Sequence, residues 1–232
     1  QKSFDVLFSE AFRRTQQEGK YKGGNEDKAF IDFEKNGKDY YDSLISNIGK
    51  TVVDVSILDK AKKVADILKD DDFTSEIFSD DNPNIEYFPK FTIEWEYITK
   101  NGKKIPCKSE LDILKIDHSK KIIYPKDLKT AYDNENFDYS YIKYRYDLQA
   151  AFYYLAVKHW AASEGMGDYS VIPMEFIVGD TSANHRRPVR YKTTIDDFQH
   201  SMSGFTLNGK YYKGLVQLIE EISWAEDNNV WN

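Results

Sequence analysis

The hydrophobic pattern of the chain changes near residue 86, and this change constrains the fold more than any other feature of the sequence. Tyr87 to Tyr97 is rich in residues typical of strands, and Ile93, Trp95 and Tyr97 alternate with Glu94 and Glu96, which is the period of a strand with one buried face. Asn101-Gly102 follows and is typical of a hairpin turn. Further strands are indicated over 105–116 and 121–128. The sequence therefore predicts a three-stranded antiparallel meander.

Helical periodicity dominates on both sides of these strands. Before them, the apolar spacing predicts helices over 4–17, 28–47, from Asp54 or Ser56 onward, and over 74–79. After them, it predicts a long helix over 140–163, strands over 171–178 and 190–193, and helices over 195–202 and 211–228. This order is typical of an α/β fold with one mixed central sheet flanked by helices. No linker is evident, so we expect a single domain over 1–232, with a helical N-terminal part (1–85) and a core (86–232).

The composition excludes several classes of protein. No stretch approaches the roughly 18 uncharged apolar residues that a membrane span needs. The single cysteine, Cys107, excludes an internal disulfide and any multi-cysteine zinc or iron–sulfur site. Residues 1–18 are mixed and charged, unlike a signal peptide. We therefore expect a cytoplasmic protein without a membrane partner.

Charge is distributed unevenly along the chain. The net charge is −7, and residues 1–98 account for all of it, because residues 99–232 carry equal numbers of acidic and basic side chains. Residues 99–130 contain nine lysines and four acids. A local basic field of this kind can hold a polyanion even on an acidic protein.

Two acids and a lysine occur where two predicted strands would lie side by side. Asp112 is on the second strand, and fourteen residues separate it from Asp127-Leu128-Lys129 at the end of the third. Because side chains alternate along a strand, Asp127 and Lys129 share a face, and the short turn brings Asp112 to the same face. One interpretation of this group is a surface ion pair at a sheet edge.

Two carboxylates with one ammonium are also typical of metal-assisted phosphodiester hydrolysis. Carboxylate oxygens suit Mg²⁺, which takes few protein ligands and keeps several waters. The metal activates a bound water and stabilises the leaving oxygen, while Lys129 would orient that water and screen charge in the transition state. Asp112, Asp127 and Lys129 are therefore candidate catalytic residues.

The helix predicted over 140–163 carries a second polar feature. Tyr146, Gln149 and Tyr153 are spaced i, i+3 and i+7, so they share one face. A glutamine between two tyrosines is unusual on a helix that is otherwise apolar. The face either packs in the core, with Gln149 at a strand edge, or lies over the candidate catalytic group.

Three segments together, Lys108–Leu114, Asp127–Thr130 and Tyr146–Tyr153, resemble the PD-(D/E)XK nuclease superfamily. Within it the chain is most similar to the exonuclease VIII (RecE-like) type of phage and prophage recombination nucleases, over about residues 90–180. The resemblance implies a restriction-endonuclease-like core. It also implies metal binding by Asp112, Asp127 and the backbone carbonyl of Leu128, with Mg²⁺ as the cofactor and Mn²⁺ as a substitute.

The resemblance also assigns roles around the metal. It makes Lys129 catalytic, and it implies DNA contacts by Lys108, Thr130, Tyr146, Gln149 and Tyr153. Beyond these, basic side chains suited to phosphate contacts are Lys103, Lys104, Lys120, Lys121, Lys126, Lys143, Arg145, Arg186, Arg187 and Arg190.

The implied activity is metal-dependent DNA exonuclease action, at double-stranded ends in phage-type recombination. A single-strand annealing protein and a homo-oligomeric assembly are the partners that this type implies. Two alternatives stay open: a restriction-like or structure-specific endonuclease, and a catalytically silent DNA-binding or scaffold protein of the same fold.

One departure from the family pattern separates these alternatives. Many relatives place a further metal ligand, histidine or glutamate, on an early helix, and this chain has no histidine before His118. Glu94 or Glu96 on the first predicted strand are candidate substitutes.

Overall fold

The computed structural model describes residues 4–17, 26–47, 53–78 and 82–230, and the chain divides into two compact units, Gln1–Leu58 and Asp59–Asn232. The first unit contains α1 (Phe4–Gln17) and α2 (Glu26–Ser46), which confirms the two expected helices. Aromatic rings join them: Phe8 and Phe12 of α1 each pack against Phe30 and Phe33 of α2, with centroids 4.7–6.4 Å apart. This apolar stripe explains why two strongly charged helices pair.

A third helix, α3 (Val55–Asp70), leads into the second unit. It begins after Asp54, whose Oδ1 accepts a hydrogen bond of 2.8 Å from the backbone N–H of Ser56. Asp54 therefore satisfies one of the N–H groups that every helix start leaves without a partner. A 3₁₀ turn, η1 (Ser75–Ile77), follows within the range expected to be helical.

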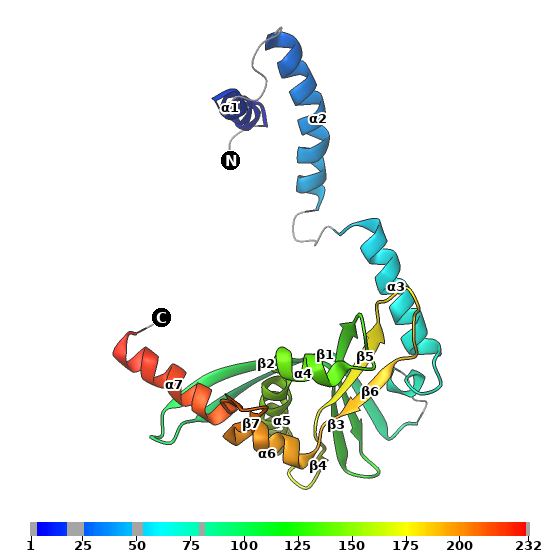
Figure 1. Ribbon diagram of the computed structural model, residues 1–232, viewed down its shortest axis with the longest axis vertical. Coiled ribbons are helices and arrows are strands. Elements are labelled where there is room, and N and C mark those ends of the chain that lie inside the picture. The colour runs from blue at the N-terminus through cyan, green and yellow to red at the C-terminus, as the bar shows by residue number, and fades with distance from the viewer. Residues whose placement is uncertain (1–3, 18–25, 48–52, 79–81, 231–232) are drawn as a thin grey trace. The chain divides into compact units, whose positions relative to one another are not determined.

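The second unit is built on a six-stranded mixed sheet (Figure 1). Its strands are β1 (Ile85–Ile98), β2 (Lys104–Asp117), β3 (Ile122–Ala131), β4 (Ser170–Val171), β5 (Glu175–Asp180) and β6 (Val189–Lys192). They are ordered β1-β2-β3-β5-β6, with β4 also paired to β3. The expected antiparallel meander of β1, β2 and β3 is confirmed, and β5 runs parallel to β3. Parallel strands need a crossover, here supplied by α4 (Phe137–Lys143) and α5 (Tyr146–Ser163).

Helices cover both faces of the sheet, which confirms the α/β class (Figure 1). On one face α5 packs Ala156 and Val157 against a cluster that includes Leu111, Leu114 and Ile123, all fully buried. On the other face, a cluster joins α3 and η1 to the sheet through Val64, Leu68, Ile77, Ile113 and Ile177. The sheet is therefore the middle layer of the core.

The helix expected over 140–163 is interrupted. It is replaced by α4 and α5, which are separated at Tyr144 and Arg145. Arg145 adopts a left-handed conformation with φ of 56°, which breaks a right-handed helix. Its guanidinium stabilises the break, donating to both carboxylate oxygens of Asp147 at 2.9 and 3.0 Å and to the carbonyl of Lys213 at 2.6 Å.

Two other expected elements are divided. The strand over 171–178 is separated into β4 and β5 around Pro173, which has no backbone N–H for a ladder. The helix over 211–228 begins only at Leu215, as α7 (Leu215–Asn228), because the preceding residues form a hairpin of β7 (Phe205–Leu207) and β8 (Lys210–Tyr212). Asn208 and Gly209 turn this hairpin with φ of 50° and 74°, as Asn-Gly turns do. The expected strand over 190–193 and helix over 195–202 are confirmed as β6 and α6 (Ile195–Ser203).

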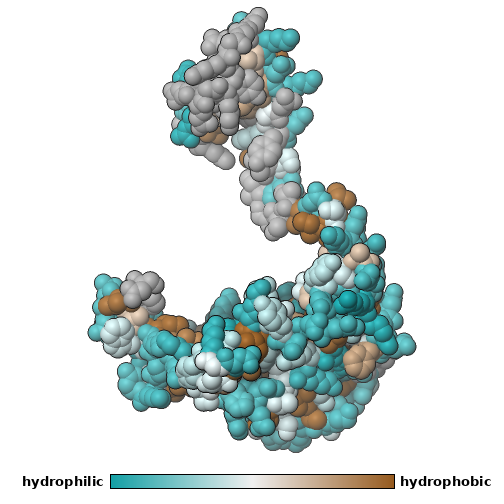
Figure 2. Space-filling view, viewed as in Figure 1, coloured by the Kyte–Doolittle hydropathy of each residue, from teal (hydrophilic) through white to brown (hydrophobic). Residues whose placement is uncertain are grey.

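The surface of the second unit is mainly hydrophilic on the face that Figure 2 shows. Within the described ranges, no helix combines the length and the apolar character that crossing a bilayer requires.

Candidate active site

The site lies where β2 and β3 separate. Their antiparallel ladder runs from Asp117 opposite Ile122 to Ile113 opposite Lys126, and no further pair follows. The next residues in this register are Asp112 and Asp127, so the two acids occupy the point of divergence. The backbone N–H of Leu128 donates to Asp112 Oδ2 at 2.8 Å. On its other side β3 pairs with β5, from Lys126 to Ala131.

Asp127 is the buried centre of the group. Lys129 Nζ lies 2.5 Å from Asp127 Oδ2, and Gln149 Nε2 on α5 donates to Asp127 Oδ1 at 3.0 Å. Burial raises the pKa of the Asp127 carboxyl, and the negative charge of Asp112 adds to the rise, although Lys129 and Lys90 oppose it. The predicted convergence of Asp112, Asp127 and Lys129 is thus present in the structure.

Aromatic rings hold the ammonium of Lys129 in place. Its Nζ lies 4.6 Å from the ring centroid of Tyr146 and 5.8 Å from that of Phe176. A cation over an aromatic face is attracted by the ring quadrupole. Tyr146 and Gln149, one helical turn apart, therefore both face the acids, as the spacing on α5 indicates.

Sequence reasoning missed a second lysine at this group. Lys90 Nζ lies 2.5 Å from Asp112 Oδ1, and this hydrogen bond raises the pKa of Lys90. Lys90 has φ of 51°, and the β1–β2 register passes from Pro89–Ile113 to Phe91–Leu111 without pairing Lys90 and Asp112. The sequence does contain a pattern that predicts this contact. Lys90 and Asp112 each stand eleven positions from Asn101, so a hairpin centred on Asn101 places them opposite each other.

The residues present fit a hard divalent cation. Asp127 Oδ2 is buried and accepts no hydrogen bond of regular geometry, despite its contact with Lys129. The Lys129 ammonium lies 2.5 Å from this oxygen, so a bound Mg²⁺, which is commonly held by only one or two carboxylates, would replace that contact. Across the ranges that the structure describes, however, no three His, Cys, Asp or Glu side chains are grouped to hold a metal.

The two candidate substitutes for a third ligand lie elsewhere. Glu94 faces Lys108 at 3.8 Å, and Glu96 faces Lys104 at 2.7 Å. Glu94 pairs with Lys108 in the ladder, four residues from Asp112, which is about 13 Å along a strand. Neither glutamate joins the site, and Lys108, an expected DNA contact, also lies away from it.

Two other expected DNA contacts differ from each other in position. Thr130 is exposed and, with Tyr146, lines a pocket of about 590 Å³ beside α4. Tyr153 instead packs, half-buried, against both core clusters on the α5 face of the sheet. The expected shared face of Tyr146, Gln149 and Tyr153 is therefore divided between the site and the core.

Most of the expected phosphate contacts are neutralised by acids. Lys126 is buried and paired with Glu175, so it is not a surface cation, and Arg190 is committed to the same carboxylate. Lys143 is the one candidate with no carboxylate within 4 Å among the residues described. The other candidates and their partners are Lys103 with Glu226 and Asp227, Lys104 with Glu96, Lys108 with Glu94, Lys120 with Asp117, Lys121 with Asp168, Arg145 with Asp147, Arg186 with Asp133, and Arg187 with Asp71.

Comparison with known proteins adds little to this geometry. No protein-family model and no curated protein matches the chain. Among solved structures, the chain is similar to the crystal structure of SSO0001, with 12% sequence identity over 95% of this chain and 84% of that one and a TM-score of 0.36.

Proposed function

We propose that the chain is a Mg²⁺-dependent DNA nuclease with the restriction-endonuclease-like core of the PD-(D/E)XK superfamily, acting as an exonuclease of the RecE-like type. One observation carries the proposal: Asp112, Asp127 and Lys129 meet where β2 and β3 diverge, with Gln149 bonded to the buried acid. The proposed setting is the cytoplasm, with double-stranded DNA ends as substrate, a single-strand annealing protein as partner and Mn²⁺ as a substitute ion.

The residues divide the chemistry among them. Asp112 and Asp127 would hold the metal, together with the Leu128 carbonyl that the resemblance adds. The bound ion would supply Lewis-acid activation of water and charge stabilisation at the leaving oxygen. Lys129, held by the Tyr146 ring, donates hydrogen bonds to the attacking water and screens charge on the phosphoryl group. Gln149 is a positioning residue, because it fixes the orientation of the Asp127 carboxylate.

A cleavage assay with matched substrates tests the proposal. We expect linear duplex DNA to be degraded with Mg²⁺ while closed circular duplex stays intact. Lys129→Ala should abolish cleavage with folding and DNA binding retained. Lys158→Ala, which removes an exposed lysine of α5 outside the candidate contacts, should cleave normally. Degradation of both substrates would indicate the endonuclease. Retained cleavage by Lys129→Ala refutes its role.

A catalytically silent DNA-binding protein is the second candidate, and one observation favours it. Among the described residues the candidate site brings together only two carboxylates, Asp112 and Asp127. Lys90 is already paired with Asp112. Calorimetric titration separates the two. Binding of Mg²⁺ or Mn²⁺ that is lost in Asp127→Asn supports the nuclease, and no binding by the wild type supports the silent protein.

A further inference from the structure

Exposed tyrosines are concentrated in one region of the second unit. Within the part of the chain that the structure describes, four tyrosines are more than half exposed: Tyr132 (79%), Tyr139 (68%), Tyr144 (58%) and Tyr211 (51%). All four line one or both of two neighbouring pockets at α4. Large aromatic rings are normally buried, so rings left in water at one place indicate a binding surface.

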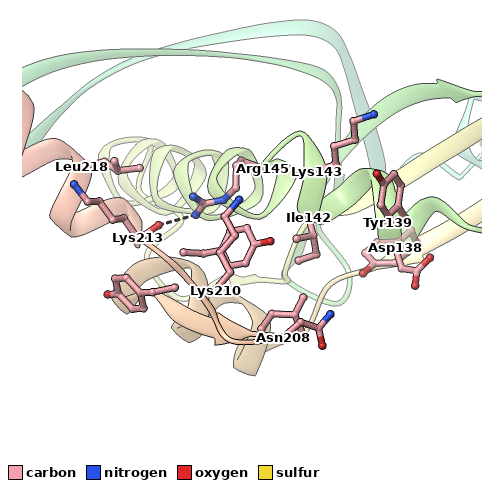
Figure 3. Close-up of a pocket in the computed structure, with 13 residues that line it drawn as sticks. Asp138, Tyr139, Ile142, Lys143, Arg145, Asn208, Lys210, Lys213 and Leu218 are labelled. Atoms are coloured by element: carbon pink, nitrogen blue, oxygen red, sulfur yellow. Dashed lines mark hydrogen bonds between the residues drawn. The ribbon is translucent and has the colours of Figure 1, made fainter. Parts of the chain in front are cut away.

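The larger of these pockets is basic, although the chain as a whole carries a net charge of −7. It has a volume of about 820 Å³ and lies between α4, the hairpin β7–β8 and the start of α7. Four cationic side chains line it against a single acid, Asp138; they are Lys143, Arg145, Lys210 and Lys213. Figure 3 shows Arg145, Lys210 and Lys213 around one part of the pocket, and Lys143 near Tyr139 in another.

Two of these cations have no acidic partner among the described residues. Lys143 Nζ lies 5.6 and 5.2 Å from the ring centroids of Tyr139 and Tyr144, and Lys210 Nζ lies 4.9 Å from that of Tyr212. Within the described ranges neither amine has a carboxylate within 4 Å, unlike Arg145, which is paired with Asp147. Lys143 and Lys210 therefore carry positive charge that is available to an anion.

The two pockets connect this surface to the candidate active site. They share Asp138 and Tyr139, and the smaller one is also lined by Thr130 and Tyr146. The link to Lys129 is Tyr146, which lines the smaller pocket and whose ring centroid lies 4.6 Å from the Lys129 amine. The surface therefore extends from β7–β8, past α4, to the residue that would orient the attacking water.

We propose that the exposed tyrosines and the basic pocket form a binding track for single-stranded DNA that ends at Lys129. Unpaired bases stack on aromatic rings whatever their sequence, and cations along the groove bind the phosphates. A duplex keeps its bases stacked on each other and out of reach of Tyr139 and Tyr144. A small ligand would be enclosed by its pocket, whereas these rings are spread over two open ones. The track's role in presenting substrate rests on the nuclease function proposed above.

Binding measured without catalysis tests the track. The full-length protein is titrated, in EDTA, into a fluorescent dT oligonucleotide of about 20 nucleotides and into a blunt duplex of the same length. Tyr139→Leu/Tyr144→Leu should weaken single-strand binding about 5- to 100-fold, while Tyr139→Phe/Tyr144→Phe, which keeps the rings, should bind like the wild type. Lys143→Ala should reduce the salt dependence of single-strand binding by about 0.7 in log–log slope.

The control and the overturning results are equally specific. Lys158 lies 5.8 Å over the Tyr154 ring on α5, outside both pockets, and Lys158→Ala should leave binding unchanged. The track is overturned if the leucine and phenylalanine variants bind single strands equally well, or if the leucine variant weakens duplex binding as much. If no cleavage is found but the leucine variant still loses single-strand binding, the nuclease proposal fails and the binding track stands.

Discussion

Glu175 should be a stability determinant of the second unit, although it is not part of the candidate active site. It is buried at the start of β5. Its register partner on β3 is Lys126, the neighbour of Asp127, so Glu175 lies on the sheet face opposite Asp127. Its carboxylate contacts Lys126 and accepts hydrogen bonds from Arg190 at 2.7 and 3.1 Å. Burial raises the pKa of Glu175, but Arg190 and Lys126 outweigh burial and hold the pKa below its ordinary value.

The expected loss of stability depends on which buried charges each substitution leaves without a partner. Glu175→Ala leaves two cations, Lys126 and Arg190, without their shared anion, and removing one partner of a buried pair costs about 3–5 kcal/mol. That is a large fraction of the roughly 5–15 kcal/mol that stabilises a typical domain. Lys126→Met should cost less, because Glu175 keeps both hydrogen bonds from Arg190.

Urea denaturation followed by tryptophan fluorescence measures this, since Trp95 is buried in the core. With a slope of about 2 kcal/mol per M, a loss of about 4 kcal/mol lowers the Glu175→Ala midpoint by about 2 M. Glu94→Ala, which removes an exposed carboxylate 3.8 Å from Lys108, should leave the midpoint unchanged. The reasoning is refuted if Glu175→Ala shifts the midpoint no more than Glu94→Ala, or less than Lys126→Met.

Two further predictions concern packing and pH. At Gly179 a Cβ would lie 2.4 Å from Val64 Cγ1, so Gly179→Ala should destabilise the protein by about 1–3 kcal/mol in thermal denaturation. Gly167 has open space around it, so Gly167→Ala is the control. A similar loss of stability in that control contradicts the argument. Hydrogen bonding by Ser119, with further help from Lys120, lowers the pKa of Asp117 to about 2. Because its folded pKa is depressed, the stability that Asp117 contributes is present above about pH 4 and is lost as pH falls through 2. Asp117→Asn should reduce the change in urea midpoint between about pH 4 and pH 2. A variant whose midpoint depends on pH as the wild type does would exclude this contribution.

The meander and the grouping of Asp112, Asp127 and Lys129 could be predicted because they depend on local information. Alternation along 87–97 and the Asn101-Gly102 turn define the register of β1 and β2. A short turn then defines the register of β3, and a strand period of two residues decides which side chains share a face. Asp112, Asp127 and Lys129 are placed by these rules alone.

The remaining differences arise where distant residues decide the local structure. The break at Arg145 depends on the carbonyl of Lys213, 68 residues away. Lys126 and Arg190 read as surface cations in the sequence, and only the pairing of β3 with β5 and β6 brings both to Glu175. Tyr153 shares a helical face with Gln149, yet core packing on the sheet takes it away from the site.

The early end of the β2–β3 ladder has a further consequence. In an uninterrupted sheet, every backbone N–H of β3 that faces β2 would donate to a carbonyl of β2. Here the amide of Leu128 instead donates to the side chain of Asp112. The sheet therefore has one hydrogen bond fewer between β2 and β3, and the Asp112 carboxylate is fixed in position. A residue inserted into the turn between β2 and β3 would shift that amide past Asp112, and the layers of the sheet and helices would persist while Asp112 lost its fixed position.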